Sequence, residues 1–253
     1  MPDSKPTSGQ RRSPRYGDAV PADQDLIEDV RRSLREVADP AKAPAMQAYM
    51  KSAMPYYGVP APVTKRVFVR VLRDHPVADR ESWLATVRAL WHDATHREER
   101  YAALALAGHR HYLAYQDPAS LELYRELIVT GAWWDFVDTV ASHRIGPILR
   151  SHHEEVRPTI VAWFTDPAMW LRRTSIICQL GAHESIDLDL LTTCIEPNLA
   201  DREFFIRKAI GWALRQHAWT DPAWVQDYVR RHEGRLSPLS RREALKNVGE
   251  GAA

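Results

Sequence analysis

Apolar residues recur every three to four positions along most of the chain, which is the spacing of amphipathic helices. The segments QDLIEDVRRSLREVA, from Gln24, and ESWLATVRALW, from Glu81, show this spacing clearly. No segment alternates convincingly between apolar and polar residues with the period of two that a half-buried strand needs. The pattern therefore predicts an all-α protein.

Asp-Pro pairs recur at points where helices could begin. An aspartate can cap a helix with its side chain, and a proline at the first helical position has its φ angle already set. The sequence thus predicts helix starts at Asp39-Pro40, Asp117-Pro118, Asp166-Pro167 and Asp221-Pro222.

A helical stretch rich in small residues repeats along the chain. The aligned stretches are YAALALAGHR from Tyr101, TVASHRIGPI from Thr139, TSIICQLGAH from Thr174 and AIGWALRQHA from Ala209. Their starts are 38, 35 and 35 residues apart, and ALKNVG from Ala244 continues the period. This period is typical of HEAT-like helical pairs, which stack into a curved solenoid with a concave face. The alternative is a coincidence among alanine-rich helices.

The two ends of the chain differ in composition from the rest. Residues 1–25 are rich in Pro, Ser, Gly and charge, and contain almost nothing to bury, so we expect a disordered tail there. We expect one helical-repeat domain over residues 26–248, followed by a short tail at 249–253. A chain of 253 residues is long enough to bury a sizeable core.

The overall composition is that of an ordinary globular protein. There are 34 Lys plus Arg against 33 Asp plus Glu, so net charge alone does not indicate a polyanionic partner. Cys178 and Cys194 lie in apolar surroundings outside any CxxC motif, which predicts buried thiols. No apolar run approaches the ~20 residues that cross a bilayer, and the N-terminus has no signal-peptide apolar region. We expect no membrane association and a cytoplasmic location.

A column of charged residues immediately precedes the repeat starts. Its members are Arg100, Asp138, Arg173, Lys208 and Glu243. If the repeats stack, these residues occupy equivalent positions, one per repeat, along one surface.

Two tryptophans accompany the middle of this column. In GAWWDFVDTV, Trp134 lies one helical turn before Asp138, and Trp212 lies one turn after Lys208. The ordinary alternative is that the charges form a solvated ladder of ion pairs and that the tryptophans belong to the core. Repeat architecture alone does not decide between these, because fold does not dictate function.

The combination of aromatic, basic and acidic groups favours chemistry on a nucleic acid. Flat aromatics stack on sugars and bases, and cations hold phosphates, whereas a carboxylate would repel them. Asp138 is best explained by cleavage of an N-glycosidic bond, because a carboxylate stabilises the oxocarbenium-like sugar and can orient the attacking water. Arg173 is expected to keep Asp138 ionised. Trp134 and Trp212 would face a cationic nucleotide such as an alkylated purine.

Five segments together closely resemble the AlkD-type DNA alkylation-repair glycosylases. They are MQAYMKSAMPYYGV, ELIVTGAWWDFVDTV, MWLRRTSI, REFFIRKAIGWALRQ and PLSRREALK, in matching order from about Ala43 to Val248. The resemblance implies a HEAT-like solenoid with a concave DNA-binding face. It also implies excision of N3- and N7-alkylated purines from duplex DNA without flipping the damaged base, unlike most enzymes that act on bases.

The resemblance also assigns residues by motif. The catalytic tryptophan and aspartate of the family fall on Trp134 and Asp138, its conserved arginine on Arg173, and its second tryptophan on Trp212. An N-terminal tyrosine falls on Tyr49, which only the resemblance identifies.

One departure from the family motif is Phe136, which stands between the tryptophan and the aspartate. It should face away from Trp134, so we expect it to pack rather than to act.

Basic residues are concentrated late in the chain. From Asp201 to Lys246 there are ten Lys plus Arg against six Asp plus Glu. Phosphate contacts would give DNA affinity that falls steeply with salt and carries little sequence preference. The candidates for such contacts are Lys208, Arg207, Arg241, Arg242 and, near the other end, Lys65 and Arg66.

Other kinds of site find little support. His92 and His96 have the i, i+4 spacing of helical metal ligands, but the motif offers no third ligand. The sequence contains no P-loop, GxGxxG, GxSxG or CxxC motif, so we expect neither a metal nor a cofactor. The expected partner is duplex DNA with alkylated purines, bound by a monomer.

Two functions of other classes remain open at this stage. The chain could be a HEAT-like scaffold that binds protein and catalyses nothing, in which case Trp134 and Trp212 are buried and Asp138 is ion-paired, with no shared cleft. It could also bind DNA lesions without catalysis, although a pure binder has no use for Asp138.

Overall fold

The computed structural model describes residues 20–246 and residue 248. Most of the expected N-terminal tail and all of the C-terminal tail at 249–253 lie outside the described residues. The first helix begins at Gln24, two residues before the expected domain boundary. It begins there because the Asp23 carboxylate accepts a hydrogen bond from the Leu26 N–H at 2.9 Å and so caps the helix.

All regular secondary structure in the described part of the chain is helical, as predicted. The α-helices are α1 (Gln24–Glu36), α2 (Ala43–Met50), α3 (Ala61–Asp74), α4 (Arg80–His92), α5 (Arg97–Ala107), α6 (Leu121–Gly131), α7 (Trp134–Val140), α8 (Gly146–Ser151), α9 (His153–Trp163), α10 (Met169–Ile177), α11 (Leu188–Ile195), α12 (Phe204–His217), α13 (Pro222–Arg231) and α14 (Pro238–Ala244). The shorter elements are η1 (Arg110–Tyr115), η2 (Pro118–Ser120), η4 (His183–Ser185) and η5 (Glu196–Asn198), which are 3₁₀ turns, and the π-helical η3 (Ala141–Ile145).

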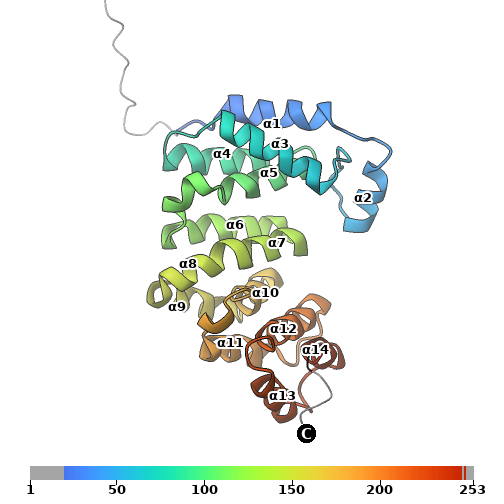
Figure 1. Cartoon of the computed structure of the whole chain (residues 1–253), viewed down its shortest axis with the longest axis vertical. Helices are drawn as coiled ribbons and strands as arrows, with labels where there is room; N and C mark the ends of the chain where they lie inside the picture. The colour runs from blue at the N-terminus through green and yellow to red at the C-terminus, as the bar shows by residue number, and fades with distance from the viewer. Residues whose placement is uncertain (1–19, 247, 249–253) are drawn as a thin grey trace, which may run out of the picture.

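The helices stack in pairs along one curved row (Figure 1). Helix α4 packs on α5, α6 on α7, and α9 on α10. The second helices of successive pairs also touch: α5 contacts α3 and α7, α10 contacts α7 and α12, and α12 contacts α14. These second helices therefore form a continuous face. The chain is an all-α helical-repeat solenoid.

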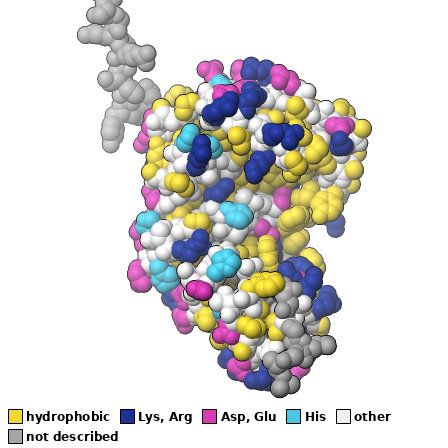
Figure 2. Space-filling model, in the orientation of Figure 1, with side chains coloured by type: hydrophobic (Ala, Val, Ile, Leu, Met, Phe, Trp, Pro, Cys, Tyr) yellow, Lys and Arg dark blue, Asp and Glu magenta, His cyan; other side chains and the backbone are white. Residues whose placement is uncertain are grey.

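The curvature leaves a hollow on one side of the molecule. Figure 2 shows it between the N-terminal part, where α2 projects, and the C-terminal part, where α12 and α14 lie. Apolar side chains border the hollow above, and Lys and Arg side chains border it below (Figure 2).

One continuous apolar core runs through the stacked helices. Phe136 of α7 is fully buried and packs edge-on against Trp91 of α4, with ring centroids 5.0 Å apart. The prediction that Phe136 packs is confirmed. Val137 and Val140 are also fully buried, so α7 is held by this face and presents its other face away from the core.

Two of the four Asp-Pro pairs begin a helical element. The Asp221-Pro222 pair begins α13 as predicted, with the Asp221 carboxylate accepting from the Trp224 N–H at 2.8 Å. The Asp117-Pro118 pair begins only the 3₁₀ turn η2. Its carboxylate is engaged elsewhere, because Arg80 donates to both oxygens at 2.6 and 2.7 Å.

The predicted helix starts at Asp39-Pro40 and Asp166-Pro167 are wrong. The α-helices that follow them, α2 and α10, begin only at Ala43 and Met169. Each aspartate instead accepts from the N–H two residues on, at 3.1 Å for Asp39 and 2.8 Å for Asp166. This is a local turn that competes with helix capping for the same side chain.

The two cysteines are free and buried, as predicted. Burial raises the pKa of Cys178, and it raises the pKa of Cys194 to about 12. Both thiols are therefore poor nucleophiles at neutral pH.

Among the described helices, none combines the length and the apolar character needed to cross a bilayer.

Candidate active site

Helix α7 carries Trp134 and Asp138 at the hollow. The chain leaves α6 at Gly131, reverses through Ala132 in a left-handed conformation (φ 43°), and enters α7 at Trp134. In Figure 1 this start of α7 lies on the right, the side on which Figure 2 shows the hollow. Residues four apart share a helix face, so the tryptophan and the aspartate lie on the same face of α7.

Asp138 is held by two parallel hydrogen bonds from Arg173 of α10. Arg173 Nε donates to Oδ1 at 2.7 Å and Nη2 donates to Oδ2 at 2.8 Å. Arg173 is only 3% exposed, whereas the Asp138 side chain is 15% exposed and so reaches the surface. A third guanidinium nitrogen donates to the Phe205 carbonyl of α12, which ties three helices of the inner face together. The bidentate geometry fixes the orientation of the carboxylate.

Opposing effects of burial and of Arg173 act on the pKa of Asp138. Burial raises the pKa of Asp138, the Arg173 hydrogen bond and charge lower it, and the charge of Asp135 adds to the rise. The net direction is upward. Arg173 favours the ionised form, as expected from the sequence, but that expectation did not include the opposing effect of desolvation. Arg173 limits the rise in pKa rather than reversing it.

Trp134 and Trp212 lie outside the core. Both are partly exposed, and neither packs against the core cluster, whereas Trp133 does. Trp133 instead joins Trp170 and Phe205 in an aromatic group with ring centroids 5.0 to 6.3 Å apart. The burial of Trp134 and Trp212 that a scaffold requires is therefore not found.

One expectation of the scaffold hypothesis is nevertheless met, because Asp138 is ion-paired. The pair does not occupy the whole carboxylate. A carboxylate accepts roughly four hydrogen bonds, so the two from Arg173 leave acceptor sites for water at the exposed edge.

A second ionic network, which the sequence reasoning missed, anchors the first turn of α7. The Asp135 carboxylate accepts from Arg97 Nη2 at 2.6 Å and from the Tyr101 hydroxyl at 2.7 Å. Tyr101 in turn shares a hydrogen bond with Tyr56 at 3.1 Å, and burial strongly raises the pKa of Tyr101. The repeat spacing could have revealed this network, since Arg97 and Asp135 are 38 residues apart, as are the first two repeat starts.

Lys208 is not a free cation of the charged column. Its ammonium lies 2.8 Å from Glu243, and the same carboxylate also binds Arg215. The column thus resolves into two separate pairs, Asp138 with Arg173 and Lys208 with Glu243. The pair of Lys208 with Glu243 is an ion pair between neighbouring repeats, as the alternative interpretation of the charged column predicted.

The other basic candidates near the C-terminus differ in whether they have a hydrogen-bond or acidic partner. Arg207 of α12 is partly buried, and its Nε has no hydrogen-bond partner within residues 20–246. Arg241 and Arg242 of α14 are both exposed, but Arg241 is paired with Glu233 at 2.6 Å. Arg242 has no acidic partner among the described residues.

The N-terminal candidates lie on the other side of the hollow. Tyr49 of α2 is 78% exposed and makes no part of the core. Lys65 and Arg66 are exposed on α3. The structure thus places an exposed aromatic ring and two exposed cations on the N-terminal helices α2 and α3.

His92 and His96 do not share a helix. His92 is the last residue of α4, and its Nε2 lies 2.6 Å from Glu126 Oε1. His96 caps α5, and its ring stacks on Tyr57 at 3.7 Å between centroids. The helical spacing that suggested metal ligands therefore does not exist.

Comparison with known proteins identifies the family and agrees with the fold. The family model described as DNA alkylation repair enzyme matches residues 30–248. A solved structure, a predicted DNA alkylation repair enzyme from Enterococcus faecalis, is 31% identical with a TM-score of 0.76 and covers 85% of this chain and 98% of its own.

A second solved structure shows likeness of fold alone. The protein smu.31 from Streptococcus mutans UA159 is 17% identical with a TM-score of 0.56, over 75% of this chain and 97% of its own. No protein of curated function matches the chain. The family match spans most of the sequence, and the chain belongs to the DNA alkylation repair enzyme family.

Proposed function

We propose that the chain is a monofunctional DNA glycosylase that removes N3- and N7-alkylated purines from duplex DNA. The observation that carries the proposal is Asp138, a surface-reaching carboxylate fixed by the buried Arg173 and accompanied by the partly exposed Trp134. Membership of the DNA alkylation repair family supports a DNA substrate.

The proposed reaction breaks the bond between the sugar C1′ and the purine nitrogen. The bond electrons leave with the base and neutralise the positive charge that alkylation placed on it, so no general acid is required. The sugar becomes an oxocarbenium-like cation, which the Asp138 carboxylate stabilises. Water, oriented by the free acceptor sites of Asp138, adds to C1′ and loses a proton. The products are the free alkylated base and an abasic site.

The surroundings of Asp138 suit such a substrate. Trp134 and Trp212 offer electron-rich ring faces to a cationic nucleotide, and Tyr49 can lie against a deoxyribose from the other side of the hollow. Arg207 and Arg242 would hold the phosphates of one strand. In this proposal the DNA backbone is gripped around the lesion and the base is not flipped. One copy of the chain is sufficient, and it acts in the cytoplasm where the DNA lies.

The test is single-turnover release of 7-methylguanine from a duplex oligonucleotide. The wild-type protein and Asp138→Asn are compared, with Glu154→Gln as the control because the Glu154 side chain is 98% exposed. Asp138→Asn should bind the duplex and lose most of the release, since the amide carries no charge. Glu154→Gln should release the base at the wild-type rate.

Three other outcomes would count against the proposal. Full release by Asp138→Asn would remove this residue from the mechanism. Tight binding of the methylated duplex without release by the wild type would favour a lesion-binding protein. Neither binding nor release would favour the scaffold.

A further inference from the structure

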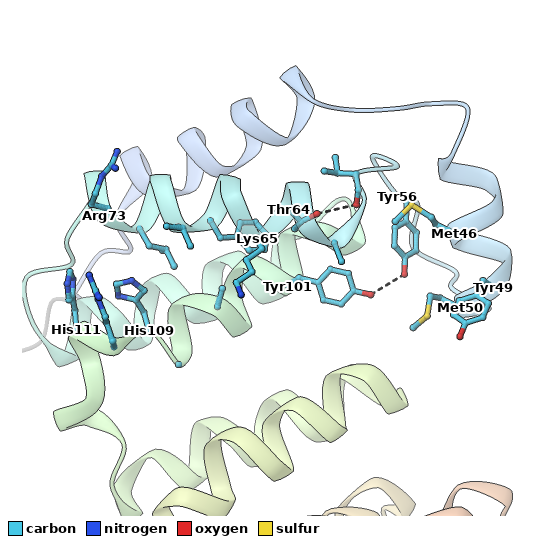
Figure 3. A pocket seen from close by; sticks show the side chains of 18 residues that line it. Met46, Tyr49, Met50, Tyr56, Thr64, Lys65, Arg73, Tyr101, His109 and His111 are labelled. Carbon is cyan, nitrogen blue, oxygen red and sulfur yellow. Dashed lines mark hydrogen bonds between the residues drawn. The ribbon is translucent and has the colours of Figure 1, made fainter. Parts of the chain in front are cut away.

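A groove of about 830 Å³ opens between α2, α3 and α5, and Asp138 does not line it. Figure 3 shows its lining side chains projecting from α3 above and α5 below, with α2 closing one end. The floor and walls are apolar: Met46, Met50, Phe68, Val69, Leu72 and Ala105. Val69 is 58% exposed, so the apolar surface is in contact with solvent rather than sealed within the core.

The polar groups of the groove are cationic or neutral. Lys65, Arg73, Arg110, His109 and His111 line it, and no Asp or Glu lines it within the described part of the chain. The side chain of Lys65 points from α3 into the space above α5, and the two histidines stand at the end opposite α2 (Figure 3).

Several of these polar groups lack a partner. Lys65 and Arg110 have no carboxylate within 4.0 Å among residues 20–246, whereas Arg73 is paired with Asp74. The Nδ1 atom of His109 is buried and makes no hydrogen bond among the described residues. An apolar groove with unpaired cations on one side attracts a negative group.

The dimensions fit a small molecule. Sites for small molecules usually enclose roughly 300–1,000 Å³ and combine apolar walls with a few polar groups that fix orientation. Ala61 and Arg73, at the two ends of α3, both line the groove. At the rise of an α-helix this gives a length of about 18 Å, so the groove is elongated.

We propose that this groove binds a small molecule with an elongated apolar body and one anionic end, such as a long-chain carboxylate. The carboxylate lies near Arg110, between the two histidines at the end opposite α2 (Figure 3), and the apolar body lies along Leu72, Val69 and Phe68 toward α2. A bare DNA backbone fits less well, because its phosphates would face an apolar floor. The proposal does not depend on the proposed glycosylase function.

The test uses the full chain and a fluorescent probe, cis-parinaric acid, with its methyl ester as the uncharged match. The acid should bind saturably at one site, and the ester should bind about tenfold more weakly because it offers no negative charge. Arg110→Ala should weaken binding of the acid by about fivefold, in the range of a partly exposed ion pair. Arg66→Ala is the matched control, since Arg66 is exposed beside Lys65 but does not line the groove, and it should change binding less than about twofold.

A groove-filling variant gives an independent check. Ala105→Trp should abolish probe binding while the protein keeps its helical circular dichroism spectrum. The proposal is overturned if no saturable binding is seen, if the ester binds as well as the acid, or if Arg110→Ala and Arg66→Ala have equal effects. Release of 7-methylguanine by the same preparations is measured separately, so failure here and failure of the glycosylase proposal are distinguishable.

Discussion

At the scale of single residues, the reactivity of Asp138 depends on a balance between burial and Arg173. Burial raises the pKa of the carboxyl, and the two hydrogen bonds from Arg173 oppose that rise. The proposed reaction needs the ionised form, so activity should be present above the pKa and disappear as the pH falls through it. The pH dependence of excision therefore reports on this pair.

Replacing Arg173 tests that balance. In Arg173→Gln the opposing charge is lost, so the pKa of Asp138 rises further and the acid limb of the pH–rate profile moves to higher pH. The measurement is single-turnover release of 7-methylguanine across pH. Arg172→Gln is the matched control, because Arg172 is paired with Asp201 instead. An acid limb that stays in place in Arg173→Gln would show that Asp138 is not the titrating group.

Substitutions of Trp133 and Trp134, at the start of α7, should have separable effects on stability and on excision. Trp133 packs against the core and Trp134 does not. We expect Trp133→Ala to lower the free energy of unfolding by about 2 kcal/mol, since a large, partly buried ring that packs against the core is lost. Trp134→Ala should stay within about 0.5 kcal/mol of the wild type, because it touches no core residue, yet lose excision.

Denaturant unfolding and base release, measured on the same two proteins, check this division. A Trp134→Ala protein as unstable as Trp133→Ala would mean that Trp134 contributes to packing. A Trp134→Ala protein with full excision would remove Trp134 from the site.

At the scale of elements, the first turn of α7 is positioned by its contact with α5. Asp135 binds the buried Arg97, which is 7% exposed at its side chain, and Tyr101. Both Trp134 and Asp138 depend on this anchor for their placement, although Asp135 touches no substrate in the proposed reaction. Asp135 is a positioning residue.

Asp135→Asn should therefore act on stability and on the pH profile together. The substitution leaves the buried Arg97 without a counter-charge, which should cost about 3 kcal/mol in the free energy of unfolding. It also removes a negative charge that raises the pKa of Asp138, so the acid limb of excision should move to lower pH. This shift is opposite in sign to that of Arg173→Gln. A purely structural role would lower stability and leave the acid limb where it is.

The sequence predicted the elements better than the contacts between them. The three-to-four-residue periodicity identified the helices, because it reflects burial of one face of each helix. The regular spacing of the stretches rich in small residues indicated how the helices stack. The helix starts at Asp39 and Asp166 failed because a local turn competes for the same side chain. An aspartate side chain can either cap a helix or close a local turn, and these two outcomes have similar free energies.

For the candidate site, the sequence predicted which residues lie together better than it predicted their ion pairs and pKa values. The column placed Asp138 beside Arg173 because residues 35 apart meet in stacked repeats. The same column suggested that Lys208 was free, whereas Glu243 of the next repeat neutralises it. The rise in the pKa of Asp138 could not be predicted from the sequence, because desolvation depends on the packing of several helices at once.

At the scale of the whole molecule, DNA affinity must come from the placement of charge rather than its amount. Lys plus Arg exceed Asp plus Glu by only one residue in the whole chain. Most of the surface should therefore be indifferent to DNA, and only cations at the hollow that lack an acidic partner should contribute fully to binding. Arg242 of α14 is exposed and has no acidic partner among the described residues, whereas its neighbour Arg241 is paired with Glu233.

These two arginines give a direct comparison in one helix. Each phosphate contact contributes about 0.9 to the slope of log affinity against log salt, so Arg242→Ala should lower the magnitude of the slope by about that amount. Arg241→Ala should lower it less, because Arg241 must first give up Glu233. The measurement is fluorescence anisotropy of an undamaged duplex at several salt concentrations. An unchanged slope in Arg242→Ala, or a larger loss in Arg241→Ala, would mean that the strand does not follow this side of the hollow, and the phosphate contacts would then have to be sought elsewhere on the inner face.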